Sequence, residues 1–295
     1  MKKNTSFTLI ELLVVIVIIG VIAGVIMVTV SSSVSNATFA RAKAFSSNVQ
    51  NSMLLNLVSE WTFDEGPTES GNAQTGDVRD TWENNDLSIT GLPQIKNGND
   101  CITNKCLQLS ASDYLIKTEA SIILKEITFE AWAKPTAINS DAAPVYGVSQ
   151  IISYNSGNTG LAYISNNKFR FRTTTANDVM LDSQHTYALN EFYYVVGTYD
   201  GSIVKIYVNG VLENSRNDQT GNLYYNGTTH FFLVSDNSSQ NRDFIGTIDD
   251  VRTYNAALSS SQIKQNYIAG LNSMLANGNI SQEEYNKRIS ELASN

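Results

Sequence analysis

The first 57 residues carry a helical hydrophobic pattern. Leu12 to Val30 form a run of 19 residues without a charge, about the length that a helix needs to cross ~30 Å of hydrocarbon. Apolar residues then recur every three or four positions up to Leu57, and no proline occurs before Pro67. The pattern predicts one long helix from about Phe7 to Leu57, apolar on all sides in its first half and amphipathic in its second.

From Glu60 to about Tyr254 the pattern changes to short β-branched and aromatic runs, separated by Gly, Asn and Asp. In FYYVVGTYDGSIVKIYVNGVLEN, the dipeptides Asp200-Gly201 and Asn209-Gly210 favour tight hairpin turns, which predicts three antiparallel strands. In EITFEAWAKP, alternate positions are apolar, which predicts a half-buried strand. Many short antiparallel strands without long helices between them indicate a β-sandwich or barrel.

The last part of the chain returns to a helical pattern. An apolar stripe at helical spacing follows the last predicted strand, at Ile263, Tyr267, Leu271 and Leu275. Ser281 and Glu284 have the spacing of a capping box, so a second short helix is expected to begin there. The two helices predict a C-terminal helical hairpin that packs on the sandwich or on a neighbouring subunit.

Composition and charge narrow the functions. The chain is 42% hydrophobic and 16% charged, which is typical of a folded protein. Residues 1–58 have a net charge of +3. The chain as a whole has a net charge of −8, so the remaining residues carry −11. An acidic body argues against nucleic-acid binding, because the phosphate backbone would be repelled.

The two cysteines, Cys101 and Cys106, lie five positions apart after a loop rich in Gly and Asn. They are too few to hold structural zinc, and His185 and His230 lie far away in sequence. A local disulfide is the favoured interpretation, with a pair of free thiols as the alternative. A disulfide would place folding in an oxidising space outside the cytoplasm.

Length alone does not identify the N-terminal segment. A secretory signal peptide usually has a shorter apolar core of ~7–15 residues and a cleavage site with small residues. An ordinary signal anchor would explain the apolar run and the orientation that Lys2 and Lys3 favour. It would not explain Glu11, because a carboxylate at the start of a membrane helix is costly and usually has a partner.

The sequence Phe7-Thr8-Leu9-Ile10-Glu11, after a short basic leader and before an apolar helix, resembles the N-terminus of type IV prepilins. The resemblance implies that prepilin peptidase cuts between Ser6 and Phe7 and that the new N-terminus is methylated. Ser6 stands where the family usually has Gly. The resemblance also implies that Glu11 pairs with the terminal amine of a neighbouring subunit, so that two buried charges satisfy each other.

This resemblance implies a structural pilus subunit that forms a homo-polymer with the help of the pilus assembly machinery. Before assembly the chain would cross the cytoplasmic membrane once with its N-terminus inside, and afterwards it would lie in an extracellular pilus. A pseudopilin of a secretion or DNA-uptake system and a membrane-tethered carbohydrate-binding module are the alternatives. The expected parts are a leader (1–6), the pilin helix (7–57), the sandwich (58–258) and the C-terminal helices (259–295).

Several segments over about 57–270 resemble the laminin-G-like, concanavalin A-like sandwich family. They are WTFDEG from Trp61, FEAW from Phe129, GTYDG from Gly197, YVNG from Tyr207 and GTIDDVRTYNAALS from Gly246. The resemblance implies an all-β jelly roll of two packed sheets, often with a calcium site and sometimes with glycan or protein binding.

Three kinds of chemistry follow from that resemblance. Hydrolysis of glycans needs two carboxylates ~5–10 Å apart, but the candidate strand has only Glu130. The adjacent Asp249 and Asp250 are expected to point to opposite faces of their strand. We therefore expect that the chain is not an enzyme. The positions that best match a family calcium site are Asp80 and Asp249, with solvated surface carboxylates as the alternative.

For glycan binding the sequence offers the pair Tyr224 and Tyr225, whose rings could stack on sugars. The same pair could instead belong to a strand that packs into the core. Surface glycans or proteins are thus candidate partners of the sandwich.

Overall fold

The computed structural model describes residues 55–66, 68–74, 76–118, 125–138, 148–154, 158–224, 230–233 and 242–294. All of them belong to one compact unit, Met53–Asn295. The predicted helix 7–57 lies outside these residues except for its last three. Its expected last residue, Leu57, is not helical, because Leu57 is buried and begins the first strand. The helical spacing of apolar residues therefore includes Leu57, although Leu57 belongs to a strand.

The larger of two sheets has nine strands in the described residues. Their bounds are β1 Leu57–Trp61, β2 Gly71–Asn72, β4 Gln94–Asn97, β5 Lys105–Leu109, β7 Ile127–Ala137, β12 Tyr193–Tyr199, β13 Val204–Val208, β14 Val211–Arg216 and β16 Ile245–Tyr254. The order across the sheet is β14-β13-β12-β7-β16-β5-β4-β2, and β1 also pairs with β16. The predicted meander is confirmed as β12, β13 and β14, and Asn209 and Gly210 turn the chain with φ of 51° and 77°.

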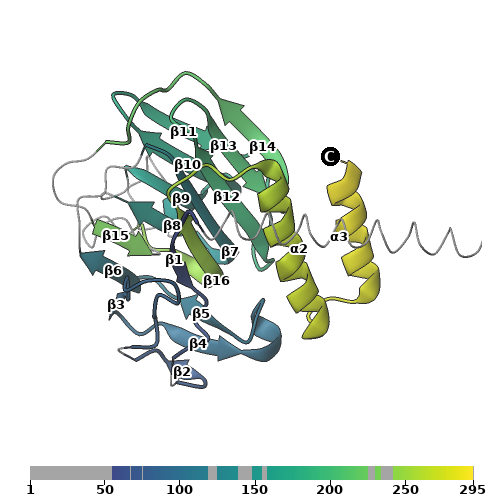
Figure 1. The fold of residues 1–295 in the computed structure, drawn as a ribbon. Coiled ribbons are helices and arrows are strands. Elements are labelled where there is room, and N and C mark those ends of the chain that lie inside the picture. Colours follow the sequence, from purple (N-terminus) through teal and green to yellow (C-terminus); the bar gives the residue numbers. More distant parts are fainter. Residues whose placement is uncertain are drawn as a thin grey trace, which may run out of the picture. The chain divides into compact units, whose positions relative to one another are not determined.

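The smaller sheet has seven strands in the same part of the chain. They are β3 Ser88–Thr90, β6 Tyr114–Thr118, β8 Val148–Tyr154, β9 Thr159–Ile164, β10 Lys168–Thr174, β11 Asp178–Asp182 and β15 His230–Leu233. Their order is β11-β10-β9-β8-β15-β6-β3. Figure 1 shows the two sheets with the two C-terminal helices, a β-sandwich consistent with a jelly roll.

Apolar side chains from both sheets fill the space between them. The core includes Trp61 and Phe63 near the start of the sandwich, and Phe129 of β7 meets Phe171 of β10 edge to face at 6.4 Å between ring centroids. Burying these side chains is the main stabilising contribution to the sandwich.

The strand β7 is buried on both faces, so the predicted half-buried strand is wrong. Glu130 and Trp132, on the face away from the core, are 0% and 1% exposed. The reason is α2 (Ser260–Ala276), which covers this face of the larger sheet: Tyr267 stacks on Trp132 with 5.6 Å between ring centroids. A Cβ on Gly270 would lie 2.4 Å from Trp132, so glycine allows the close approach.

The helix α2 is followed by α3 (Gln282–Ser294), and Figure 1 shows both helices on the side of β12, β13 and β14. A full capping box opens α2 at Ser259 and Gln262. At the start of α3, Ser281 Oγ accepts from the amide of Glu284 at 3.1 Å, as predicted. The Glu284 carboxylate, however, accepts from Arg288 Nε at 2.7 Å.

Candidate functional site

The outer face of the smaller sheet carries a cavity of about 190 Å³. Residues from β8, β9, β10 and β11 line it, together with one arginine that precedes β16. They are Val148, Gln150, Gly160, Ala162, Arg170, Arg172, Asp178, Met180 and Arg242. Alternation places them there, because Phe169 and Phe171 of β10 point into the core and the arginines between and after them point outward.

Two ion pairs cross from β10 to the edge strand β11. Arg170 donates from Nε and Nη2 to the two carboxylate oxygens of Asp182, at 2.6 and 3.0 Å. Arg172 pairs in the same way with Asp178, at 2.9 Å for both contacts. Burial would raise the pKa of Asp178, but hydrogen bonding to Arg172 and its charge lower that pKa below its ordinary value.

The floor of the cavity has a buried acceptor. Gln150 is 3% exposed, and its side-chain oxygen Oε1 has no hydrogen-bond partner. Beside it, Gly160 and Ala162 line the cavity with small apolar groups. A buried acceptor without a donor costs about 1–3 kcal/mol, and a bound hydroxyl or amide would remove that cost. The cavity is thus suited to a small polar ligand.

Of the predicted tyrosine pair, Tyr224 is described, and it is not among the described residues that line this cavity. Tyr224 is 48% exposed, and its amide donates to the carbonyl of Thr174 at the end of β10, at 2.6 Å. It lies outside the named strands, so it is not the core strand residue of the alternative interpretation. Tyr225 lies outside the described residues.

The residues predicted from the sequence do not include Arg170, Arg172 or Gln150. The alternation KFRFRTT was a usable signal, because it predicts two outward-facing arginines on one strand. No signal marked Gln150. Its burial depends on how β8 and β9 pack, and a bulge between Gln150 and Ile152 shifts the strand register there.

Asp80 organises a loop. Its Oδ1 accepts from the amides of Glu60 and Trp82 at 2.9 and 3.0 Å, and its Oδ2 accepts from the amide of Asn85 at 3.2 Å. These bonds fasten the loop that follows Val78 to β1. The carboxylate is 7% exposed, so it is not the solvated surface group of the alternative interpretation.

Asp249 binds the loop that the disulfide closes. The predicted disulfide between Cys101 and Cys106 is present, with 5.3 Å between the Cα atoms. Asp249 Oδ2 accepts from the amides of Ile102 and Thr103 inside this loop, at 2.8 and 3.1 Å. Burial raises the pKa of Asp249, the charge of Asp250 adds to the rise, and these amides oppose it.

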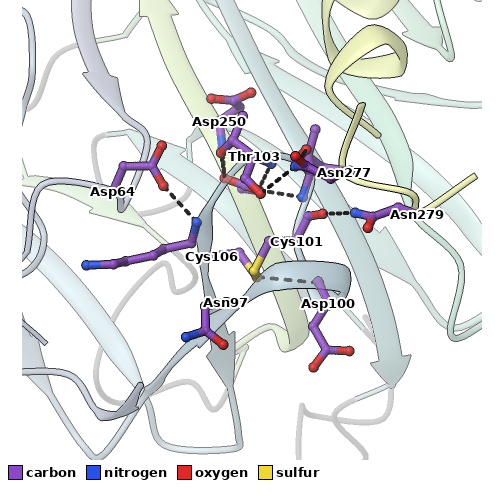
Figure 2. Close-up of a disulfide and its surroundings, with 12 residues drawn as sticks. Asp64, Asn97, Asp100, Cys101, Thr103, Cys106, Asp250, Asn277 and Asn279 are labelled. Carbon is purple, nitrogen blue, oxygen red and sulfur yellow. Dashed lines mark hydrogen bonds between the residues drawn. A yellow bond between two sulfur atoms is a disulfide. The ribbon is translucent and has the colours of Figure 1, made fainter. Parts of the chain in front are cut away.

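The same loop is bound from the other side by the turn between α2 and α3. Figure 2 shows Asn277 and Asn279 beside the disulfide. Asn277 Nδ2 donates to the carbonyl of Thr103 at 3.1 Å, and Asn279 Nδ2 donates to the carbonyl of Cys101. The disulfide loop therefore joins the sandwich to the C-terminal helices.

The structure does not bring Asp80 and Asp249 together in one hydrogen-bonded group: each carboxylate accepts from a different set of backbone N–H groups. Ca²⁺ takes six to eight oxygen ligands, so the calcium site stays a prediction. Within the described ranges, no group of three or more Asp, Glu, His or Cys side chains is arranged to hold a metal ion.

Glu130 lies beneath α2 in a buried polar network. Its carboxylate accepts from Tyr194 Oη at 2.5 Å, Tyr254 Oη at 3.1 Å, Asn266 Nδ2 at 3.0 Å and Arg252 Nη1 at 3.3 Å. Burial and the charge of Glu130 raise the pKa of both tyrosines. A carboxylate with four donors and no exposed surface is a structural group.

The adjacent acidic pair does not follow strand alternation. The register of β16 shifts between Asp249 and Arg252, and Asp250 has φ of 47°. Both carboxylates are buried, since Asp249 is 0% and Asp250 7% exposed. The prediction that Asp249 and Asp250 point to opposite faces assumed a regular strand, and the strand is irregular at this pair.

The processing and assembly residues Ser6, Phe7 and Glu11 lie outside the described residues. In the part of the chain that is described, neither C-terminal helix has the length and hydrophobicity for a membrane span. The predicted spanning segment falls in the other part.

Comparisons with known proteins confirm both resemblances. Residues 1–27 match the prokaryotic N-terminal methylation motif, which implies a substrate of prepilin peptidase and pilus assembly. Residues 109–264, more than half of the chain, match the concanavalin A-like lectin/glucanases superfamily. A search of curated proteins gave no significant match.

Solved structures share the fold at low sequence identity. Domain 4 of AbnA, an extracellular arabinanase from Geobacillus stearothermophilus in complex with arabinotriose, is 16% identical with a TM-score of 0.53, over 71% of this chain and 97% of that one. The binding domain of Paraclostridial Mosquitocidal Protein 1 is 16% identical with a TM-score of 0.54, over 75% of this chain and 53% of that one. The receptor binding domain of a botulinum neurotoxin C/D mosaic serotype is 17% identical with a TM-score of 0.53, over 74% and 52%.

The chain thus spans about half the length of the two toxin domains and almost all of the arabinanase domain. At these identities the likeness shows the fold alone. With the match over residues 109–264 and the motif over residues 1–27, the chain belongs to the concanavalin A-like lectin/glucanases superfamily and carries a type IV pilin methylation motif at its N-terminus.

Proposed function

We propose that this chain is a subunit of a type IV pilin-like surface filament that displays its sandwich as a carbohydrate-binding module. The observation that carries the filament part is the methylation motif over residues 1–27, which includes Phe7 and Glu11. In this proposal the chain is cut before Phe7, leaves the cytoplasmic membrane and polymerises through its apolar N-terminal segment.

The carbohydrate-binding part rests on the cavity of the smaller sheet. It combines arginine donors, an unsatisfied buried acceptor at Gln150 and an apolar floor, a mixture that suits a sugar ring with polar edges and C–H faces. The shared fold with an arabinanase domain solved in complex with arabinotriose, and with toxin binding domains, is in line with a binding role. No hydrolysis is part of the proposal.

Glu11→Ala tests the filament part. We expect the variant to remain in the membrane at the normal amount but to form few or no surface filaments, because the terminal amine of each neighbouring subunit would be buried without its partner. Electron microscopy counts the filaments, and an antibody against the sandwich measures the membrane pool. Normal filaments from the variant would contradict the role of Glu11.

Mass spectrometry of the mature N-terminus separates the alternatives. A methylated Phe7 is the expected N-terminal residue. A mature chain that keeps the residues from Lys2 to Ser6 would indicate a membrane-tethered binding module. Processed chains that form only short filaments in the envelope would indicate a pseudopilin.

A further inference from the structure

We propose that the cavity on the outer face of the smaller sheet binds a carboxylated sugar, such as a hexuronate or a sialic acid. This inference rests on the proposed carbohydrate-binding function and names the chemical class of its ligand. The cavity, at about 190 Å³, is smaller than the ~300–1,000 Å³ of pockets for drug-sized ligands, so it suits one sugar ring.

The charge of the cavity is the first observation. The chain has a net charge of −8, yet three of the seven arginines in the described residues line this cavity. Asp178 is the one carboxylate among the lining residues, and Asp182 pairs with Arg170 from just beside it. Guanidinium groups that line a cavity on an acidic protein favour an anionic ligand over a neutral one, because they donate strongly to carboxylate oxygens.

The geometry of Arg170 is the second observation. Two of its nitrogens bind Asp182, and the third, Nη1, donates to the sulfur of Met180 at 3.6 Å. A thioether is a weak acceptor, whereas a carboxylate accepts strongly from a guanidinium. Met180 is 36% exposed and unbranched, so it can move aside for a ligand carboxylate.

Gln150 and the apolar floor select a sugar among anions. The unsatisfied Oε1 of Gln150 requires a donor, which a sugar hydroxyl supplies and a carboxylate, sulfate or phosphate dianion does not. Val148 and Ala162 are buried on this face of the sheet and offer an apolar surface to the C–H face of a sugar ring. A carboxylated sugar matches all three features of the cavity.

The test uses the full chain, purified in a detergent without a sugar headgroup. Calorimetry measures binding of a glucuronate oligosaccharide, a sialylated oligosaccharide, a neutral glucose oligosaccharide of matched length, acetate and a poly-glutamate peptide. We expect at least one acidic sugar to bind about tenfold or more tightly than the neutral sugar, with weaker binding at high salt. Which acidic sugar binds better distinguishes the two sources of the carboxylate.

Two matched variants assign the binding to the cavity. Arg170→Gln removes the guanidinium from the site, and we expect it to weaken binding of the acidic sugar about tenfold or more. Arg216→Gln removes an exposed arginine at the end of β14 in the other sheet, where it pairs with Asp218, and we expect less than a twofold change. Gln150→Leu is expected to weaken both acidic and neutral sugars, because it removes the acceptor for a hydroxyl. Thermal unfolding of each variant confirms that it is folded.

Equal affinity for acidic and neutral sugars, or an unchanged affinity in Arg170→Gln, would overturn this inference while the carbohydrate-binding function stands. Equal binding of poly-glutamate or acetate would overturn it in favour of a general anion site. Absence of binding to every sugar would overturn both the inference and the carbohydrate-binding part of the proposed function.

Discussion

At the scale of single residues, buried carboxylates hold distant parts of the sandwich together. Glu130 accepts from groups on β12, β16 and α2, and Asp80 and Asp249 accept from loop amides. A carboxylate can be buried only when donors replace its water, so each of these side chains depends on several partners at once. Removing the carboxylate leaves those partners buried without an acceptor.

Glu130→Ala is expected to lower the free energy of unfolding by about 3–5 kcal/mol, because it leaves two buried tyrosine hydroxyls without their acceptor and removes one of the three carboxylates that pair with the buried Arg252. Urea unfolding followed by tryptophan fluorescence measures the loss. The exposed Glu83→Ala is the matched control and should change stability by ~0.5 kcal/mol or less. A loss in Glu130→Ala no larger than in this control would contradict the role of the network.

The stability that Glu60 contributes should depend on pH. Burial would raise the pKa of Glu60, but the charge of Arg252 and hydrogen bonds from Thr81 and Arg252 lower that pKa below its ordinary value. A lowered pKa in the folded state means that the contribution is complete above the pKa of the unfolded state, near 4.5, and is lost as the pH falls through the folded pKa.

Glu60→Gln should therefore be less stable than the original protein at pH 7, by about 1 kcal/mol at most for this partly exposed pair, and the difference should shrink below about pH 4. Thermal unfolding across pH 3 to 7 would show it. A difference that stays constant with pH would mean that Glu60 is not ionised in its contact with Arg252.

The sequence shows on which face of a strand a side chain lies, but it does not show which distant groups that side chain contacts. Alternation correctly placed Phe129 in the core and Glu130 on the opposite face. It could not show that α2 covers that face, because the donor Asn266 lies 136 residues away. For the same reason it could not show which backbone amides donate to Asp80 and Asp249, because those contacts form only on folding.

At the scale of elements, the disulfide loop connects parts that are far apart in sequence. It receives Asp249 from β16 and two asparagines from the turn between α2 and α3 (Figure 2). Local signals predicted the disulfide and the two helices. Their connection could not be predicted, because it depends on where the helical hairpin docks on the larger sheet.

Replacing both cysteines with serine is expected to lower the free energy of unfolding by about 2 kcal/mol, the loop entropy of a bond between residues five apart. The amides of Asn277 to Asn279 should then exchange hydrogen faster, because the carbonyls that hold their side chains become mobile. Hydrogen exchange with mass spectrometry compares the turn in the variant and in the original protein, with the start of α2 near Ser260 as an internal reference. Exchange at the turn that is the same in both proteins would contradict the connection.

At the scale of the whole molecule, residues 53–295 form one compact unit with a single main core between the sheets. Periodicity and turn dipeptides were sufficient to predict a β-sandwich or barrel followed by two helices, because both signals are local, and the family resemblance implied the sandwich. The cavity could not be predicted, because it forms from four strands whose register includes a bulge at Gln150. Its arginines were visible in the sequence only as an alternating pattern.

We expect a fragment of residues 53–295 to fold without the preceding segment and to unfold in one cooperative transition, because its core is continuous. Circular dichroism during heating tests this. Under the proposed function the fragment should also bind sugar as tightly as the full chain, since the described residues that line the cavity lie within it. Two separate transitions, or an unfolded fragment, would show that the preceding segment is required for folding.

The short strand β1 is the first strand after the N-terminal segment. In the proposed filament, tension between the filament and a bound sugar would enter the sandwich through this strand. One edge of β1 pairs with β16, and on the other side its Glu60 bonds with the amides and carboxylate of the Asp80 loop. Pulling β1 out therefore breaks two sets of hydrogen bonds together, and Asp80 strengthens the sandwich at the point where the load arrives.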